Sequence, residues 1–315
     1  MSELTRDIHR AVITGPTGSV GNALVRLLLN EQIETVAVVR PGSPRAAELP
    51  EHPLLQVLEC DISELSTLSS TISPAVDAFF HFAWAHTSGP GRNDMSAQIQ
   101  NIQYTIDACR AAAELGCQVF VGAGSQAEYG RTSCALSEDT PCFPENGYGM
   151  AKLCAGQMSR VECQKLGIAH IWPRILSVYG PHDGMQSLVS MTIQKLLAGE
   201  RMPLTAGEQM WDYLYADDAA RALLLMAQRG KDGAVYPLGS GVARPLKEYI
   251  LQIQQQIAPE AELGFGEIAY GPLQVMYLQA NLSELERDTG FRPQTDFDVG
   301  IGQTITWMRS KWRDE

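Results

Sequence analysis

The chain has 315 residues, 45% of them hydrophobic, and a formal net charge of −12. This length accommodates one large domain or two interleaved ones. The acidic balance argues against nucleic acid and anionic membrane surfaces as partners, because no basic field would attract them. The seven cysteines are scattered, odd in number and without a C-x-x-C pair, which favours free thiols in a reducing cytoplasm and no metal site. No apolar run approaches membrane-spanning length, so we expect a cytoplasmic protein.

Apolar runs alternate with helical patterns through residues 1–180. Strands are expected at 11–14, 35–39, 54–59, 78–83, 118–123 and 169–175, and helices at 20–30, 65–70, 97–115 and 149–166. This alternation predicts an α/β fold, a Rossmann-type doubly wound parallel sheet. Ligands of such sheets bind outside the carboxyl ends of the strands, at the switch point of the strand order.

The pattern loosens after residue 180. Helices are expected at 187–198, 217–228, 246–256 and 282–289, and strands at 212–215 and 235–238. We predict that residues 1–180, joined by 208–240, form a dinucleotide-binding domain. Residues 181–207 and 241–315 would form a smaller, interleaved C-terminal lobe, with substrate bound between the two.

A glycine-rich turn joins the first strand to the first helix. The segment Thr14–Gly21 reads TGPTGSVG and has a G-x-x-G-x-x-G spacing. Glycine permits the tight turn and close backbone approach, and the helix N-terminus supplies free N–H groups and a positive dipole end to a pyrophosphate. The turn residues assigned to the cofactor are Gly15, Thr17, Gly18, Ser19, Val20 and Gly21.

Two residues after the next strands bear on the choice of cofactor. Arg40 follows the second strand, where an acidic residue would favour NAD and an arginine favours the 2′-phosphate of NADP. We therefore favour NADP(H), with NAD(H) as the alternative. Asp61, followed by Ile62, ends the third strand, and its carboxylate either accepts from the adenine amino group or caps the next helix.

Tyr148 and Lys152 form a Tyr-x-x-x-Lys pattern that places both side chains on one helix face. A free tyrosine has a pKa of about 10, too high for proton transfer near neutrality. A nearby ammonium and a nicotinamide cation stabilise the tyrosinate and lower that value. The pair therefore predicts a general acid/base for carbonyl–alcohol chemistry coupled to hydride transfer.

Together these motifs resemble an extended short-chain dehydrogenase/reductase of the NAD-dependent epimerase/dehydratase family, over nearly the whole chain. The resemblance implies that Ser125 binds the reacting carbonyl oxygen, that Tyr148 transfers the proton, and that Lys152 binds the nicotinamide ribose. It also implies that Asn101 bends its helix and helps to place the lysine. The further cofactor contacts expected from the resemblance are Phe82, Ala83, Trp84, Asn101, Tyr148, Pro173 and Arg174.

The chain departs from the family pattern on the substrate side. Gln126 and Ala127 replace the Asp-Glu pair of family dehydratases, so we predict that the enzyme is not a 4,6-dehydratase. Ser177 replaces the substrate-binding asparagine, and Trp211 replaces one of the arginines that clamp the substrate diphosphate. The missing charge could come from Arg244, Arg201 or Lys195. The residues expected at the substrate are Trp84, Ser125, Gln126, Ala127, Glu128, Ser177, His182, Trp211 and Arg244.

The reaction we favour is reduction of a 4-keto nucleotide sugar, the chemistry of the CDP- and dTDP-4-keto-6-deoxyhexose reductases that the chain resembles. Arg40 supports it, because cells keep NADP mostly reduced. The alternatives are C4 epimerisation of a nucleotide sugar with tightly bound NAD and a non-catalytic NAD(P)-binding regulator. The resemblance also implies a homodimer through the helices at 97–115 and 149–166.

Overall fold

The computed structural model describes residues 5–73 and 75–313. Its central sheet is parallel and has the strand order β12–β7–β5–β4–β1–β2–β3, with the short β6 also paired to β7. The strand order reverses between β1 and β4, which makes this the switch point. The strands are β1 (Arg10–Thr14), β2 (Glu34–Val39), β3 (Leu55–Glu59), β4 (Ala78–His81), β5 (Val119–Gly122), β6 (Gly124–Ser125), β7 (Ala169–Ile175) and β12 (Val235–Leu238).

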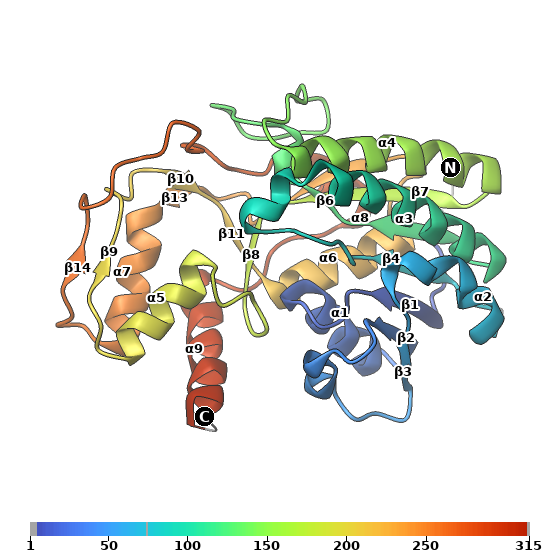
Figure 1. Ribbon diagram of the computed structural model, residues 1–315, viewed down its shortest axis with the longest axis horizontal. Helices are drawn as coiled ribbons and strands as arrows, with labels where there is room; N and C mark the ends of the chain where they lie inside the picture. The colour runs from blue at the N-terminus through green and yellow to red at the C-terminus, as the bar shows by residue number, and fades with distance from the viewer. Residues whose placement is uncertain (1–4, 74, 314–315) are drawn as a thin grey trace.

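Helices cover both faces of this sheet (Figure 1). Successive strand residues point to opposite faces, so Ile13 and Phe80 pack under α1 and α6, whereas Val12 and Phe79 pack under α2 and α3. The helices are α1 (Ser19–Asn30), α2 (Leu68–Thr71), α3 (Met95–Glu114), α4 (Gly147–Leu166), α6 (Ala216–Arg229) and α8 (Ser283–Thr289). Short 3-10 turns are η1 (Pro44–Glu48), η2 (Ile62–Thr67), η3 (Gly89–Asn93) and η4 (Gln126–Glu128).

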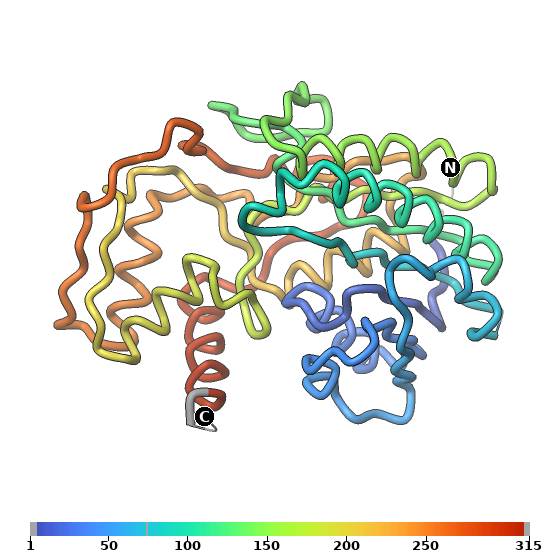
Figure 2. Tube along the Cα trace, in the orientation of Figure 1, coloured from blue at the N-terminus to red at the C-terminus, as the bar shows by residue number. Residues whose placement is uncertain are grey.

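A second group of elements packs beside the carboxyl ends of the strands, around an apolar cluster that includes Ile193, Ile253 and Ile305. The chain enters this group after β7, returns to the sheet as β12, and leaves again (Figure 2). Its elements are α5 (Leu188–Leu197), α7 (Leu246–Ile257) and α9 (Phe297–Arg313), with strand pairs β8 (Ser177–Tyr179) and β11 (Tyr213–Tyr215), β9 (Met202–Pro203) and β14 (Leu263–Gly264), and β10 (Met210–Trp211) and β13 (Arg244–Pro245).

The predicted fold class is confirmed, and the strands expected at 169–175 and 235–238 occur with those bounds. The helix expected at 65–70 is instead the 3-10 turn η2 followed by one turn of α2. Helix α9 was not predicted. The residue ranges of the two domains stay a prediction, and their ends at 1–4 and 314–315 lie outside the described residues. Within residues 5–73 and 75–313, no helix has both the length and the apolar character that crossing a membrane requires.

Candidate active site

The turn between β1 and α1 brings the backbone against the end of β4. Gly15 has a φ of +72°, and a Cβ there would lie 2.8 Å from the backbone nitrogen of Ala83. A Cβ on Gly21 would lie 2.2 Å from the carbonyl oxygen of Gly15, so both positions require glycine. At Gly18 the nearest atom to such a Cβ is 4.0 Å away. Gly18, the middle glycine of the motif, therefore leaves open space at the start of α1.

This open space fits the pyrophosphate of a dinucleotide. No side chain caps α1, and the hydroxyl of Ser19 is buried without a hydrogen-bond partner among the described residues. Free N–H groups and the positive end of a helix dipole bind phosphate oxygens. Thr17 and Val20, also assigned to the cofactor, are half-buried on the same turn. The donor set therefore suits NAD or NADP.

Arg40 and Asp61 follow the neighbouring strands β2 and β3. Asp61 caps η2 by accepting from the backbone N–H and the hydroxyl of Ser63, at 3.0 and 2.7 Å. These bonds lower the pKa of the Asp61 carboxyl, with a smaller contribution from Arg40. The capping alternative is thus present in the structure, and Ile62 packs at the edge of the core. Arg40 is exposed, and its contact with a ribose phosphate stays a prediction.

Close packing of η4 on α4 brings Ser125 and Tyr148 together. Asn146 caps α4 by accepting from the N–H of Gly149 at 2.9 Å. A Cβ on Gly149 would lie 2.3 Å from the carbonyl oxygen of Ala127, so glycine allows η4 to reach the first turn of α4. Burial raises the pKa of Tyr148, and the hydroxyl of Ser125, as a hydrogen-bond partner, lowers it. The two predicted catalytic residues therefore meet across these two elements.

Lys152 lies one turn further along α4 and is buried. Its Nζ donates to the carbonyl oxygen of Ala123 at 2.7 Å and lies 3.7 Å from the centre of the Trp84 ring. The same nitrogen is 5.8 Å from the ring centre of Tyr148. Burial lowers the pKa of Lys152 to about 7. The ammonium is thus held between a carbonyl dipole and an aromatic face, beside Tyr148.

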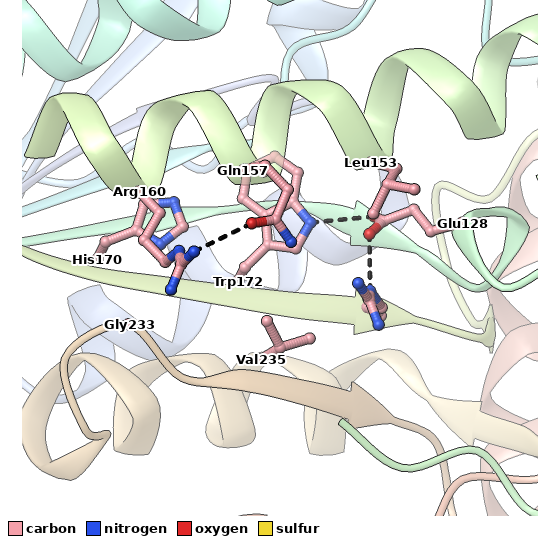
Figure 3. A pocket seen from close by; sticks show the side chains of 10 residues that line it. Glu128, Leu153, Gln157, Arg160, His170, Trp172, Gly233 and Val235 are labelled. Atoms are coloured by element: carbon pink, nitrogen blue, oxygen red, sulfur yellow. Dashed lines mark hydrogen bonds and ion pairs between the residues drawn. The ribbon is translucent and has the colours of Figure 1, made fainter. Parts of the chain in front are cut away.

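Glu128, Pro173 and Arg174 were predicted to contact ligands, but the structure uses them inside the protein. The Glu128 carboxylate is fully buried and accepts from the backbone N–H of Ser125 at 2.8 Å and from the indole of Trp172 at 3.0 Å (Figure 3). It also pairs with Nε of the buried Arg174 at 2.7 Å. Pro173 is buried within β7. We therefore correct the roles of Glu128 and Arg174. The buried Glu128 carboxylate stabilises the η4 turn, and Arg174 compensates its charge inside the protein.

The sequence carried a signal for this role of Glu128. Ser125 to Glu128 is an S-x-x-E capping box, in which the serine hydroxyl accepts from Ala127 at 3.2 Å while the glutamate accepts from the serine N–H. Gln126, between them, is half-buried. The cap orients Ser125 from two sides. The capping box therefore fixes Ser125 at the start of η4.

The predicted substrate residues of the second group lie on neighbouring strands, because Trp211 on β10 is the register partner of Arg244 on β13. Ser177 accepts from the indole N–H of Trp211 at 2.8 Å, so two of the departures from the family pattern contact each other. The Arg244 guanidinium lies 4.2 Å from the ring centre of Tyr249 and donates to Gln252 at 3.1 Å. Contact of these residues with a substrate stays a prediction.

His182 does not face open solvent. Its Nδ1 lies 2.6 Å from a carboxylate oxygen of Glu48, and its ring centre lies 4.8 Å from that of Trp307, with the two rings tilted by 48°. Arg45, in η1, donates to the His182 carbonyl oxygen at 2.6 Å. We therefore correct His182 from a substrate contact to a residue that joins the η1 segment to α9.

Two buried amide side chains of α3 hold the segment that follows β4. Asn101 accepts from and donates to the backbone of Ala85, at 2.9 and 3.0 Å, so it fixes this segment and does not contact Lys152. Gln98 accepts from the Trp84 indole N–H at 2.9 Å. Neither Gln98 nor Arg92, whose guanidinium lies 4.5 Å from the ring centre of Tyr148, was predicted. No motif in the sequence marks either residue.

Solved structures of similar fold cover almost the whole chain. UDP-glucose 4-epimerase from Thermotoga maritima superposes with a TM-score of 0.86 at 19% identity, covering 96% of this chain and 99% of that one. The dTDP-glucose 4,6-dehydratase DesIV from Streptomyces venezuelae, solved with NAD bound, has a TM-score of 0.85 at 24% identity, covering 96% and 98%. These likenesses establish the fold.

The exclusion of 4,6-dehydratases is wrong. A curated relative from Haemophilus influenzae is a dTDP-glucose 4,6-dehydratase, 21% identical over 94% of this chain and 96% of its own length. The exclusion depended on two positions, Gln126 and Ala127, which say only that the family's acid/base pair is absent there. Two positions do not outweigh a similarity that spans the whole chain.

The family of the chain follows from a match over most of its length. A model of the NAD dependent epimerase/dehydratase family matches residues 11–239, which include the β1–α1 turn, Ser125, Tyr148 and Lys152. The match agrees with the parallel sheet, the glycine cradle at α1 and the meeting of η4 with α4. The chain belongs to the NAD dependent epimerase/dehydratase family.

Proposed function

We propose that the protein transfers a hydride between NAD(P) and C4 of a nucleotide-activated sugar. The observation that carries this proposal is the close packing of η4, which follows Ser125, on the first turn of α4, which carries Tyr148, with the Lys152 nitrogen 5.8 Å from the Tyr148 ring centre. This arrangement supports general acid/base chemistry at a carbonyl or alcohol. The relatives named for nucleotide sugars, a dTDP-glucose dehydratase and a UDP-glucose epimerase, support the substrate class.

In this proposal each side chain acts on one atom. The Ser125 hydroxyl orients the reacting oxygen, and the Tyr148 hydroxyl gives it a proton or removes one. Lys152 stabilises the tyrosinate electrostatically and contacts the nicotinamide ribose. The dinucleotide, when bound at the β1–α1 turn, supplies or accepts the hydride. The substrate would lie between the dinucleotide-binding domain and the C-terminal lobe that we predict from the sequence.

Reduction of a 4-keto sugar is the reaction we favour, and C4 epimerisation is second. Arg40, exposed after β2, supports NADP and hence net reduction. The solved relative with NAD bound and the epimerase of similar fold favour the second reaction. Both reactions use Ser125, Tyr148 and Lys152 in the same way, so the cofactor balance separates them.

We also propose a homodimer through α3 and α4. These helices contact each other and expose large apolar side chains, among them Ile99 on α3 and Met158 and Val161 on α4. Exposed apolar side chains that gather on one face favour a protein partner. Sedimentation equilibrium of the wild type and of Val161→Glu tests this, and a monomer at micromolar concentration in the wild type would contradict it.

The function is tested by incubating the protein with a panel of nucleotide sugars and their 4-keto derivatives, with NADH, NADPH, NAD⁺ or NADP⁺. Stoichiometric NADPH consumption on a 4-ketone supports reduction. A C4-inverted sugar without net cofactor change supports epimerisation, and a 4-keto-6-deoxy product identifies a dehydratase. Dinucleotide binding without turnover of any sugar would favour the non-catalytic alternative and overturn the proposal.

A further inference from the structure

Arg92 holds a cation against the ring of the acid/base tyrosine. Its guanidinium carbon lies 4.5 Å from the centre of the Tyr148 ring, closer than the Lys152 nitrogen at 5.8 Å. Within residues 5–73 and 75–313, its side chain makes a single hydrogen bond, a long contact of 3.5 Å to the carbonyl oxygen of Thr87. No carboxylate among the described residues lies within ion-pair distance of Arg92. The charge is therefore available to Tyr148.

The backbone on both sides of Arg92 is anchored. The buried side chain of Gln98 donates to the carbonyl oxygen of Gly91 at 3.1 Å. The side chain of Asn93 accepts from the N–H of Gly147 at 2.9 Å, one residue before the tyrosine. A Cβ on Gly147 would lie 3.0 Å from the carbonyl oxygen of Arg92, so η3 packs directly on the start of α4. Hydrogen bonds and packing of the neighbouring residues thus fix the backbone at Arg92, and contacts of its own side chain do not.

We propose that Arg92 is a positioning residue that stabilises the ionised form of Tyr148 from the face of its ring. A cation is attracted to a neutral aromatic face, and more strongly when the ring carries the negative charge of a phenolate. The attraction is therefore larger in the tyrosinate than in the tyrosine. This inference rests on the proposed function, in which Tyr148 transfers the proton.

Burial has the largest influence on the pKa of Tyr148 and raises it. The hydroxyl of Ser125 and Arg92 on η3 lower this pKa, and Glu128 on η4 raises it. The Lys152 nitrogen on α4 lies over the same ring at 5.8 Å. Lys152 is buried and its pKa is lowered to about 7, so its ammonium loses protons as the pH rises above neutrality. An arginine keeps its charge throughout this range. Arg92 is therefore the cation that persists when Lys152 becomes neutral.

The test measures Tyr148 directly, without a substrate. The protein is labelled with ¹³C at the ring carbon that bears the tyrosine hydroxyl, and the Tyr148 resonance is assigned by its loss in Tyr148→Phe. Its pKa is then read from an NMR pH titration of the protein alone and with NAD⁺. We expect Arg92→Gln to raise the pKa of Tyr148 by about 1, which is about tenfold less tyrosinate at a given pH. Arg92→Lys should retain part of the effect, because the charge remains but the planar stacking is lost.

Arg309→Gln is the matched control, because it removes one positive charge from an exposed position on α9 and should leave this pKa unchanged. An unchanged pKa of Tyr148 in both Arg92→Gln and Arg92→Lys would overturn the inference. Full turnover by Tyr148→Phe on the true substrate would instead overturn the proposed function. The two failures are therefore distinguishable.

Discussion

The two halves of the candidate site are built in different ways. The β1–α1 turn owes its shape to glycines within a few residues of one another, since the Cβ of Gly21 would strike Gly15. The reacting half joins Ser125, Tyr148 and Lys152 through contacts with residues distant in the chain, such as Lys152 with Ala123. Local shape is visible in a short motif, whereas long-range contacts depend on the whole fold. Mutations in the two halves should therefore affect different properties of the protein.

The largest expected effect is on chemistry in the reacting half. Tyr148→Phe removes the hydroxyl that transfers the proton and should lower kcat by about 10²- to 10⁴-fold. The ring that contacts Trp84 stays in place, so circular dichroism and dinucleotide binding should remain as in the wild type. Tyr104→Phe, at a half-buried position on α3 where the hydroxyl donates to Gln100 at 3.5 Å, is the control and should keep full activity. Loss of dinucleotide binding in Tyr148→Phe would show that the halves are not separable.

The second effect concerns stability of the same half. Glu128→Ala leaves the buried Arg174 without its partner and should lower the free energy of unfolding by about 3–5 kcal/mol. Glu145→Ala breaks an exposed ion pair with Arg131 and should lower the free energy of unfolding far less, because solvent screens both charges. Urea denaturation of both variants measures the difference. Equal values for the two would contradict the structural role that we assign to Glu128.

The third prediction separates shape from ligand binding within the β1–α1 turn. Gly21→Ala places a methyl group 2.2 Å from the Gly15 carbonyl oxygen and should destabilise the protein by about 1–3 kcal/mol. Gly18→Ala meets no protein atom closer than 4.0 Å, so its unfolding free energy should stay within about 0.5 kcal/mol. Its methyl group would occupy space expected for the pyrophosphate, so affinity for NAD(P) should fall. Thermal unfolding and a fluorescence titration distinguish the two; unchanged affinity in Gly18→Ala would remove this glycine from the cofactor site.

Sequence patterns predicted the parts of this molecule that depend on neighbouring residues. The sheet, the glycine turn and the Tyr148–Lys152 pair follow from periodicity and short motifs, and the structure has them in place. The prediction that Glu128 contacts substrate is wrong. Glu128 completes a capping box with Ser125, and this local pattern indicates a structural role. Arg92 could not be predicted, because its contact with Tyr148 depends on how η3 packs on α4, which no local pattern encodes.

The reacting half should also make the free energy of unfolding depend on pH, through the buried Lys152. Its pKa of about 7 in the folded protein lies below the value of about 10.4 for an unfolded chain. Between these values the unfolded chain binds more protons, so the free energy of unfolding contributed by this group rises with pH. The slope is at most about 1.4 kcal/mol per pH unit.

Lys152→Met should remove this slope between pH 7 and about 10, whereas Lys165→Met, exposed near the end of the same helix, should keep it. Urea denaturation across that pH range measures both. A wild-type slope equal to that of Lys152→Met would mean that the lysine keeps its charge inside the protein. Its contacts with the Ala123 carbonyl oxygen and the Trp84 ring would then outweigh the desolvation of the ammonium, and the reacting half would hold two permanent cations beside Tyr148.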